Sequence, residues 1–149
     1  MDDLNAQSLF ERLPFVEHLG IELESVEDGR AVATLDLAEH HSSVPWSTVA
    51  HGGVTYSLAD TVGGAAVFSL HQQPNPTIDM RIDYLSPATE SLRAEAEVDR
   101  DGDTTTVVSV DITNGAGDAV ADARGVYKTA GGEGQTTWTT RDGDAEDPT

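Results

Sequence analysis

Residues 51–70, HGGVTYSLADTVGGAAVFSL, contain a helical stretch that runs from about Gly53 to Leu70. Its apolar side chains recur at helical spacing and cover more than one face of the helix: Val54, Leu58, Val62, Ala65, Phe68 and Leu70. A helix that is apolar almost all round is buried over most of its surface. We therefore expect a sheet to wrap around this helix instead of carrying it on an exposed face.

The sequence on either side of this helix alternates between apolar and polar residues, which is the period of half-buried strands. The predicted elements are a helix at 4–13 stopped by Pro14, strands at 21–24 and 31–37 joined by a turn at 27–29, a loop at 38–50, and strands at 77–85, 92–100, 104–113 and 118–129. They predict an α+β fold in one domain, residues 1–130, with an antiparallel sheet of about six strands wrapped around one long central helix. Residues 131–149 are rich in Gly, Thr and Asp and are predicted to be a disordered acidic tail.

The charge balance is strongly acidic, with 27 Asp and Glu against 8 Lys and Arg and a formal net charge of −19 in 149 residues. Such a surface repels nucleic acid and anionic membranes, so neither is expected as a partner. The acidic residues are spread from Asp2 to Asp147, and lysine occurs once, at Lys128. This composition is typical of proteins from salt-accumulating halophiles, in which molar salt screens the repulsion between like charges.

Neither a signal peptide nor a membrane segment is predicted. Residues 1–4, MDDL, lack the basic and then apolar pattern of a signal peptide, and no apolar run reaches the roughly 18 residues that span a bilayer. A soluble, cytoplasmic protein is expected. The chain has no cysteine, which excludes disulfides, a thiol nucleophile and a thiolate metal site.

Asp60 is the only residue of a formally charged type among the 39 residues 40–78, where the chain's 23% charged content would place about nine. An acid isolated in a buried helix is costly unless it is paired or neutralised. It is either a surface or structural hydrogen-bonding carboxylate, or a functional one. Tyr56, Gly63 and Gly64 share its helix face. Because two glycines inside a helix cost about 1 kcal/mol each, they indicate a close approach and favour the functional interpretation.

The helix begins at His51-Gly52-Gly53, nine residues before Asp60. The first N–H groups of a helix are unpaired and carry the positive end of its dipole. Glycine lets a ligand reach these groups, so the motif outlines an oxyanion-binding site. A plain flexible turn is the alternative for two adjacent glycines, and the nearby Asp60 favours the binding site.

Residues 51–61, HGGVTYSLADT, resemble the signature of the PaaI-like, phenylacetate-pathway branch of the 4-hydroxybenzoyl-CoA thioesterase superfamily. Residues 14–21 resemble the opening of that branch, residues 79–88 its strand after the helix, and residues 117–123 its last hairpin. The resemblance covers about residues 10–130. It implies a hotdog fold, a sheet wrapped around a central helix, and assembly into homodimers or homotetramers with active sites across the dimer interface.

The resemblance also implies an activity, the hydrolysis of an acyl-CoA thioester without a cofactor or a metal. Gly52 would polarise the thioester carbonyl through its N–H, and Asp60 of the opposite subunit would act as general base or nucleophile. His51 would orient the loop or contact the thioester, and Thr77 would help to place water. The small-residue face beside Asp60 suits a medium-chain or aromatic acyl group.

Further residues around this centre are predicted to bind the substrate: Gly53, Trp46, Tyr56, Gly63 and Gly64 near the acyl group and thioester, and Arg81 and Arg100 among the strand cations that could meet the CoA phosphates. Packing in the core or in an interface is the alternative for Trp46. The remaining histidines, His18, His40, His41 and His71, do not have the spacing of a metal-ligand set.

The chain departs from the pattern of the branch at Pro45, where asparagine usually stands six residues before the histidine. Ser43 and Ser47 are the candidate replacements. Three alternatives to a thioesterase are a hotdog hydratase or dehydratase, a non-catalytic acyl-CoA-binding protein and a structural protein. The first needs an Asp/His motif that is not found, the second would keep the Gly52 site, and the third explains neither Asp60 nor the glycines.

Overall fold

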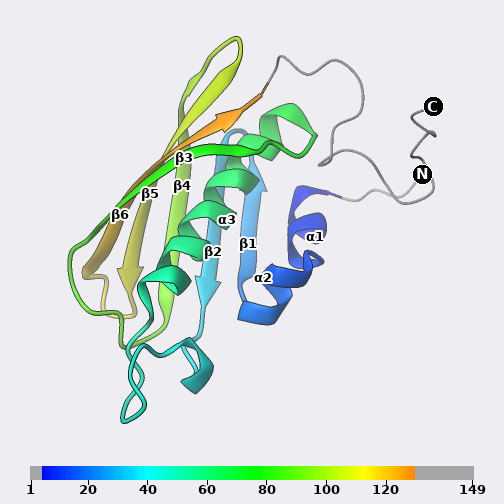
Figure 1. Cartoon of the computed structure of the whole chain (residues 1–149). Coiled ribbons are helices and arrows are strands. Elements are labelled where there is room, and N and C mark those ends of the chain that lie inside the picture. The colour runs from blue at the N-terminus through cyan, green and yellow to red at the C-terminus, as the bar shows by residue number, and fades with distance from the viewer. Residues whose placement is uncertain (1–4, 130–149) are drawn as a thin grey trace, which may run out of the picture.

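The computed structural model describes residues 5–129, which form a six-stranded antiparallel sheet with one long helix packed against it (Figure 1). Its elements are α1 (Ala6–Glu11), α2 (Pro14–Leu19), β1 (Glu22–Glu27), β2 (Arg30–Leu35), the 3-10 turn η1 (Glu39–His41), α3 (Gly52–His71), β3 (Thr77–Tyr84), β4 (Leu92–Asp101), β5 (Thr105–Asn114) and β6 (Ala119–Lys128). The strand order is β1-β2-β4-β5-β6-β3. This architecture confirms the predicted α+β fold, whereas the predicted tail at 131–149 lies outside the described residues. The helices of the described part are all too short or too polar to cross a bilayer.

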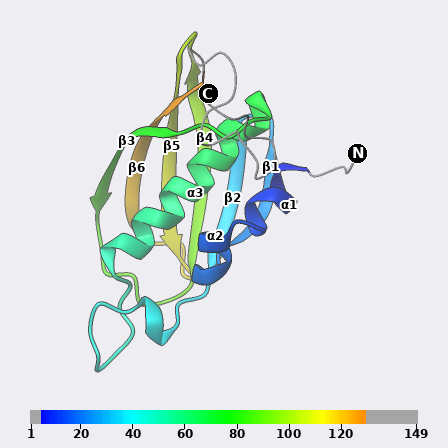
Figure 2. The same cartoon turned by 45° about the vertical axis from the view of Figure 1, so that its right-hand side comes forward.

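α3 lies along one face of the sheet, and α1 and α2 lie on the same side near β1 (Figures 1 and 2). The helix contributes Leu58, Val62 and Val67, none of which has any exposed surface. Full burial of such side chains stabilises by about 1.5–3 kcal/mol each. The facing strands present small buried residues that let the helix approach closely: Ala31, Ala33, Ala94, Ala96, Ala121 and Ala123. This packing fixes the position of α3 on the sheet.

One side of α3 stays uncovered within the chain. Tyr56 is exposed, and Asp60 and Gly64 are partly exposed on the same side of the helix. The sheet therefore covers α3 from one side and leaves open the strip that carries the isolated carboxylate.

Pro14 begins a second helix, which the sequence analysis missed. α1 ends at Glu11, and Pro14 occupies the first helical position of α2. Proline fits this position because the N–H that it lacks would have no partner in the first turn. α2 then stops at Gly20, whose φ of 83° favours glycine.

The two edges of the sheet differ. β1 has α1 beside it, and Gln7 Nε2 donates a hydrogen bond to the Leu23 carbonyl at 2.6 Å. β3 pairs with β6 on one side, and no strand of residues 5–129 pairs with its other side. Ile78 and Tyr84 on this strand are 56% and 53% exposed. An exposed edge strand with apolar side chains is a template for pairing with another chain.

The outer face of the sheet carries a row of four carboxylates. Glu95 on β4 lies opposite Asp111 on β5. Asp122 on β6 lies opposite Asp111 on one side and opposite Asp83 on β3 on the other. Side chains directly opposite each other are about 5 Å apart, so these like charges repel. Burial raises the pKa of Asp111, and Asp122 and Glu95 raise it further.

Candidate active site

Asp60 lies in the third turn of α3 and is held from strands β3 and β6. Thr77 Oγ1 donates a hydrogen bond to Asp60 Oδ1 at 2.7 Å. The Tyr127 hydroxyl oxygen lies 3.0 Å from the same Oδ1 and 2.9 Å from the Asp60 carbonyl oxygen. Thr77 and Tyr127 are opposite each other in the β3–β6 register, which is why both hydroxyls reach one carboxylate. Among residues 5–129, no hydrogen bond reaches Oδ2 of Asp60.

Tyr127 is a residue of this site that the sequence analysis missed. Its side chain is 1% exposed. Burial raises the pKa of Tyr127 well above its ordinary value, and the charge of Asp60 and the hydrogen bond to it act in the same direction. The phenol therefore keeps its proton at neutral pH and acts as a donor. Burial, and then the charge of Asp60, also raise the pKa of Tyr56.

Glycines make the space that Tyr127 occupies. A Cβ at Gly63 would lie 2.6 Å from the Tyr127 hydroxyl oxygen, and a Cβ at Gly125 would lie 2.8 Å from Tyr127 Cε1. Gly64 is less constrained, because a Cβ there would be 3.7 Å from both Phe10 and Tyr127. The close approach expected at the helix glycines is thus made by a tyrosine of the same chain. Gly63 is buried beneath it and offers no surface for the predicted contact with substrate within one chain.

The start of α3 leaves one N–H group free. His51 is the N-cap, and its Nδ1 accepts a hydrogen bond from the Gly53 N–H at 2.9 Å. The Gly52 N–H has no acceptor among the described residues. Tyr84, also missed by the sequence analysis, donates its hydroxyl to the Gly52 carbonyl at 2.7 Å, and burial raises the pKa of Tyr84. His51 therefore holds this turn, and Gly52 carries the available donor instead of Gly53.

A groove of about 520 Å³ opens beside Gly52. Its lining is mostly apolar and comes from the loop before α3, the first turn of α3 and the segment after β3: Val49, Ala50, Gly52, Thr55, Tyr84, Leu85, Ser86, Pro87, Ala88 and Val120. This volume lies within the range of small-molecule sites, roughly 300–1,000 Å³. Asp60 does not contribute to the lining, since it lies about 12 Å further along the helix at 1.5 Å per residue.

The loop between η1 and α3 projects beyond the sheet in both views (Figures 1 and 2). Ser42 ties this loop, because its hydroxyl accepts hydrogen bonds from the N–H groups of Val44 and Val49 at 3.2 and 3.0 Å and lies 2.7 Å from the Ser47 carbonyl. This serine was not among the two replacements expected for the missing asparagine. Trp46 is 81% exposed and does not line the groove, so one chain alone does not place it in an acyl pocket.

His41 anchors the beginning of that loop. Its buried ring accepts a hydrogen bond at Nδ1 from the Ala38 N–H at 2.9 Å, so Nε2 carries the proton and donates to the Leu19 carbonyl at 2.7 Å. The His41 carbonyl in turn accepts a hydrogen bond from the His51 N–H at 2.8 Å. One histidine thus connects α2, η1 and the turn before Gly52.

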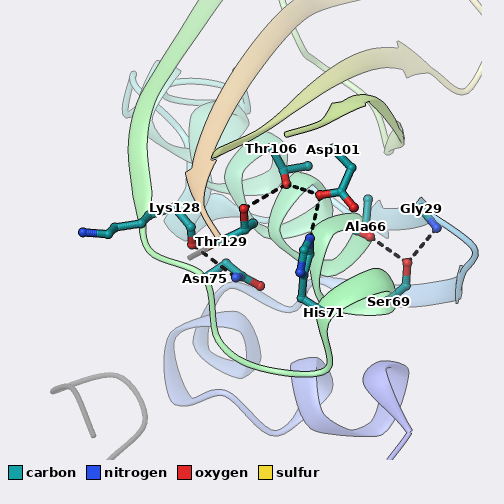
Figure 3. A network of polar contacts seen from close by, with 9 residues as sticks. All are labelled: Gly29, Ala66, Ser69, His71, Asn75, Asp101, Thr106, Lys128 and Thr129. Atoms are coloured by element: carbon teal, nitrogen blue, oxygen red, sulfur yellow. Dashed lines mark hydrogen bonds and ion pairs between the residues drawn. The ribbon is translucent and has the colours of Figure 1, made fainter. Parts of the chain in front are cut away.

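A polar network holds the C-terminal end of α3 (Figure 3). His71 Nε2 lies 2.7 Å from Asp101 Oδ1, and Thr106 Oγ1 donates to the same oxygen at 2.7 Å. The hydrogen bond from Thr106, and then that from His71, lower the pKa of Asp101. Ser69 Oγ accepts a hydrogen bond from the Gly29 N–H at 2.8 Å. Both ends of α3 are therefore tied to other elements of the chain.

The two arginines predicted to bind CoA phosphates lie apart. Arg81 on β3 is exposed and lies 3.5 Å from Asp83. Arg100 on β4 precedes Asp101, whose carboxylate contacts His71 at the far end of α3. Within one chain Arg100 is therefore remote from the groove. In the part of the chain that the structure describes, no group of three or more His, Cys, Asp or Glu side chains could hold a metal ion.

Known proteins resemble this chain in sequence and in architecture. A sequence model of the thioesterase superfamily matches residues 47–121. The acyl-coenzyme A thioesterase PaaI of Escherichia coli is 32% identical over 132 residues, which cover 86% of this chain and 91% of that protein. Its solved structure matches with a TM-score of 0.77 over 86% of this chain and 92% of its own. A hypothetical thioesterase of Streptococcus pneumoniae, solved with coenzyme A, has a TM-score of 0.69 at 31% identity over 74% of this chain and 86% of its own. A protein of Halobacterium salinarum is 32% identical over 121 residues, 78% of this chain and 80% of its own.

The six-stranded sheet folded over one long helix, together with these thioesterase relatives, identifies a thioester hydrolase of the hotdog fold. The chain belongs to the thioesterase superfamily. The resemblance to the PaaI-like branch, the hotdog fold and the enzyme class predicted from the sequence are thereby confirmed.

Proposed function

We propose that this protein is an acyl-CoA thioesterase that hydrolyses a medium-chain or aromatic acyl-CoA to a carboxylate and CoA. The observation that carries the proposal is the Asp60 carboxylate, which two hydroxyl groups hold by Oδ1 while Oδ2 accepts no hydrogen bond from residues 5–129. The relatives support the substrate class, because PaaI is named an acyl-coenzyme A thioesterase and the Streptococcus pneumoniae structure contains coenzyme A. The size and apolar lining of the groove beside Gly52 support the acyl preference.

In the proposed reaction, the thioester carbonyl oxygen accepts a hydrogen bond from the Gly52 N–H at the positive end of the α3 dipole. Asp60 Oδ2 takes a proton from a water molecule as the water oxygen attacks the carbonyl carbon. The tetrahedral intermediate collapses, the C–S bond breaks, and the CoA thiolate leaves and takes up the proton. Direct attack by Asp60 gives the same products through an anhydride that water then hydrolyses.

We propose that each site is shared between two subunits of a homodimer, and that dimers pair into a homotetramer. Gly52 and Asp60 of one chain are about 12 Å apart along α3. Both groups must come within about 3 Å of the reacting atoms, so one chain cannot supply both to one thioester. Two antiparallel α3 helices beside a two-fold axis bring Gly52 of one chain near Asp60 of the other. The open strip of α3 around Tyr56 and the free edge of β3 support this arrangement.

Other contacts with substrate follow from the same arrangement. Trp46 and Arg81 are exposed in one chain and are our candidates for contacts made across the dimer, Trp46 with the acyl group and Arg81 with the CoA phosphates. The excess of 27 acidic over 8 basic residues and the relative in Halobacterium salinarum support a protein adapted to the cytoplasm of a salt-accumulating halophile.

The test of the activity is a thiol-release assay in molar KCl over a panel of acyl-CoAs, with wild type and Asp60→Asn compared. Asparagine keeps the shape of the side chain but removes the base, so kcat should fall by at least ~10²-fold while the oligomer stays intact. Equal turnover by the two proteins would refute the role of Asp60. A wild type that binds acyl-CoA but releases no thiol would instead be a non-catalytic binding protein.

Complementation tests the shared site. Asp60→Asn is mixed with Gly52→Pro, which removes the N–H at a helical position where proline is otherwise tolerated. A mixed dimer would hold one doubly damaged site and one intact site, so up to half of the sites in heterodimers should regain activity. No recovery after demonstrated subunit exchange, with both variants folded by circular dichroism, would exclude the shared site.

A further inference from the structure

We propose that Tyr127 is a positioning residue of the thioesterase reaction, whose hydroxyl fixes Oδ1 of Asp60 so that Oδ2 is the oxygen presented to the substrate. The proposal rests on the proposed function, because it concerns the carboxylate that carries that function. It adds to the site a residue of the last strand, which lies 67 positions beyond Asp60 in the chain.

The geometry around Oδ1 supports this role. The buried Tyr127 hydroxyl oxygen is 3.0 Å from Oδ1 and 2.9 Å from the carbonyl oxygen of the same residue. Thr77 adds a second donor to Oδ1 at 2.7 Å. Two donors from adjacent strands therefore meet one carboxylate oxygen, and the rotation of the Asp60 side chain is fixed. The other oxygen, Oδ2, is left for a ligand because no described residue donates to it.

The local sequence is adapted to the hydroxyl and not only to the ring. A Cβ at Gly63 would meet the Tyr127 hydroxyl oxygen at 2.6 Å, but would meet the ring carbons Cζ and Cε1 only at 3.4 and 3.5 Å. With phenylalanine at position 127, alanine would fit at position 63. Glycine inside a helix lowers stability by about 1 kcal/mol relative to alanine. The chain thus carries a destabilising residue at the place where the hydroxyl passes to reach Asp60.

The hydroxyl is a permanent donor. Burial, and then the charge of Asp60, raise the pKa of Tyr127 well above its ordinary value. A phenolate beside the carboxylate would add like charge in a site with little exposure to water, so the protonated form is kept. Tyr127 therefore does not exchange protons with the substrate, and its effect on the reaction passes through Asp60.

Loss of this hydroxyl is expected to change kcat far more than KM. A hydrogen bond to a charged group is worth about 1.5–3 kcal/mol, so an incorrectly held carboxylate should lower kcat by roughly 10- to 100-fold. KM should change less than about twofold, because the groove and Gly52 are untouched.

The experiment compares wild type, Tyr127→Phe and Thr77→Val in molar KCl, with the acyl-CoA that wild type hydrolyses fastest. Thr106→Val is the matched control, because Thr106 also donates to an aspartate Oδ1 at 2.7 Å, but to that of Asp101 in the network of Figure 3. Tyr127→Phe and Thr77→Val should both lower kcat by roughly 10- to 100-fold while KM changes less than about twofold, and Thr106→Val should leave both kcat and KM unchanged.

The outcomes separate this proposal from the proposed function. Inactive Asp60→Asn together with a Tyr127→Phe enzyme of unchanged kcat overturns the positioning role alone. A fall in kcat that comes with a comparable change in KM, or an equal fall in Thr106→Val, indicates a structural role and also overturns it. A wild type without thioesterase activity removes the proposed function and this inference together.

Discussion

Replacement of Gly63 by alanine places a methyl carbon 2.6 Å from the Tyr127 hydroxyl oxygen, closer than real side-chain contacts allow. In an unobstructed helix the same substitution stabilises by about 1 kcal/mol. Here the tyrosine must move, which costs about 1–3 kcal/mol for overpacking and about 1.5–3 kcal/mol for the lost hydrogen bond to the carboxylate. The free energy of unfolding should therefore fall by roughly 2–5 kcal/mol.

Tyr127→Phe removes the obstructing atom and makes the prediction specific. The nearest ring carbon to the new methyl group is then 3.4 Å away, an ordinary contact, so Gly63→Ala in this background should be neutral or stabilising. Urea unfolding at fixed KCl on the four proteins of the double-mutant cycle should give a coupling free energy above about 2 kcal/mol. Gly64→Ala is the control, because its methyl group would lie 3.7 Å from Tyr127 and Phe10 and should not destabilise. Equal effects of Gly63→Ala in both backgrounds would show that the hydroxyl does not require the glycine.

Three further predictions concern charge. Burial and two neighbouring acids raise the pKa of Asp111, so the folded protein holds this proton more tightly than the unfolded protein does. The protein therefore loses stability as the pH rises above about 4. Asp111→Asn should have a higher melting temperature than wild type at pH 7, and this gain should vanish below about pH 4. The lowered pKa of Asp101 has the opposite effect, so the contribution of this carboxylate to stability is present above about pH 4 and is lost in acid. Thr106→Val should lower the melting temperature at neutral pH. A loss of melting temperature that does not shrink on acidification would contradict this reasoning. The melting temperature should rise from ~0.1 to ~3 M KCl, since the Debye length falls from about 10 Å to below 3 Å, and equal values would refute the halophilic interpretation.

The fold was largely predictable because its pattern is local. Apolar and polar residues alternate along β4, β5 and β6, and apolar residues recur at helical spacing along α3. These patterns predicted strand and helix ends within one or two residues of those observed. α2 and η1 were missed for physical reasons. Proline ends a helical pattern in the sequence, but it also fits the first position of a new helix, as Pro14 does here. The three residues of η1 carry no apolar period that could reveal a helix.

The site was predictable in part. Asp60 and Thr77 were named from the sequence and meet in the structure. Tyr127 was not named, because a tyrosine at the end of a strand is ordinary packing until the register of β6 beside α3 is known. A signal was present in Gly63, which correctly indicated a close approach but not what approaches, whereas Gly64 has only ordinary contacts. The hydrogen bonds of Ser42 depend on the conformation of the loop, which no periodic pattern in the sequence predicts.

The row of carboxylates on β4, β5, β6 and β3 also disfavours association of two chains through the outer face of the sheet. Two copies stacked with their outer faces together would bring Glu95, Asp111, Asp122 and Asp83 of one chain against the acids of the other. Such gatekeeping charges disfavour the face-to-face stacking from which aggregates grow. Their effect weakens when salt or protons neutralise them. Low salt therefore strengthens the repulsion between the outer faces of folded chains, and the barrier to stacking through this side of the sheet is highest where the ionic strength is lowest.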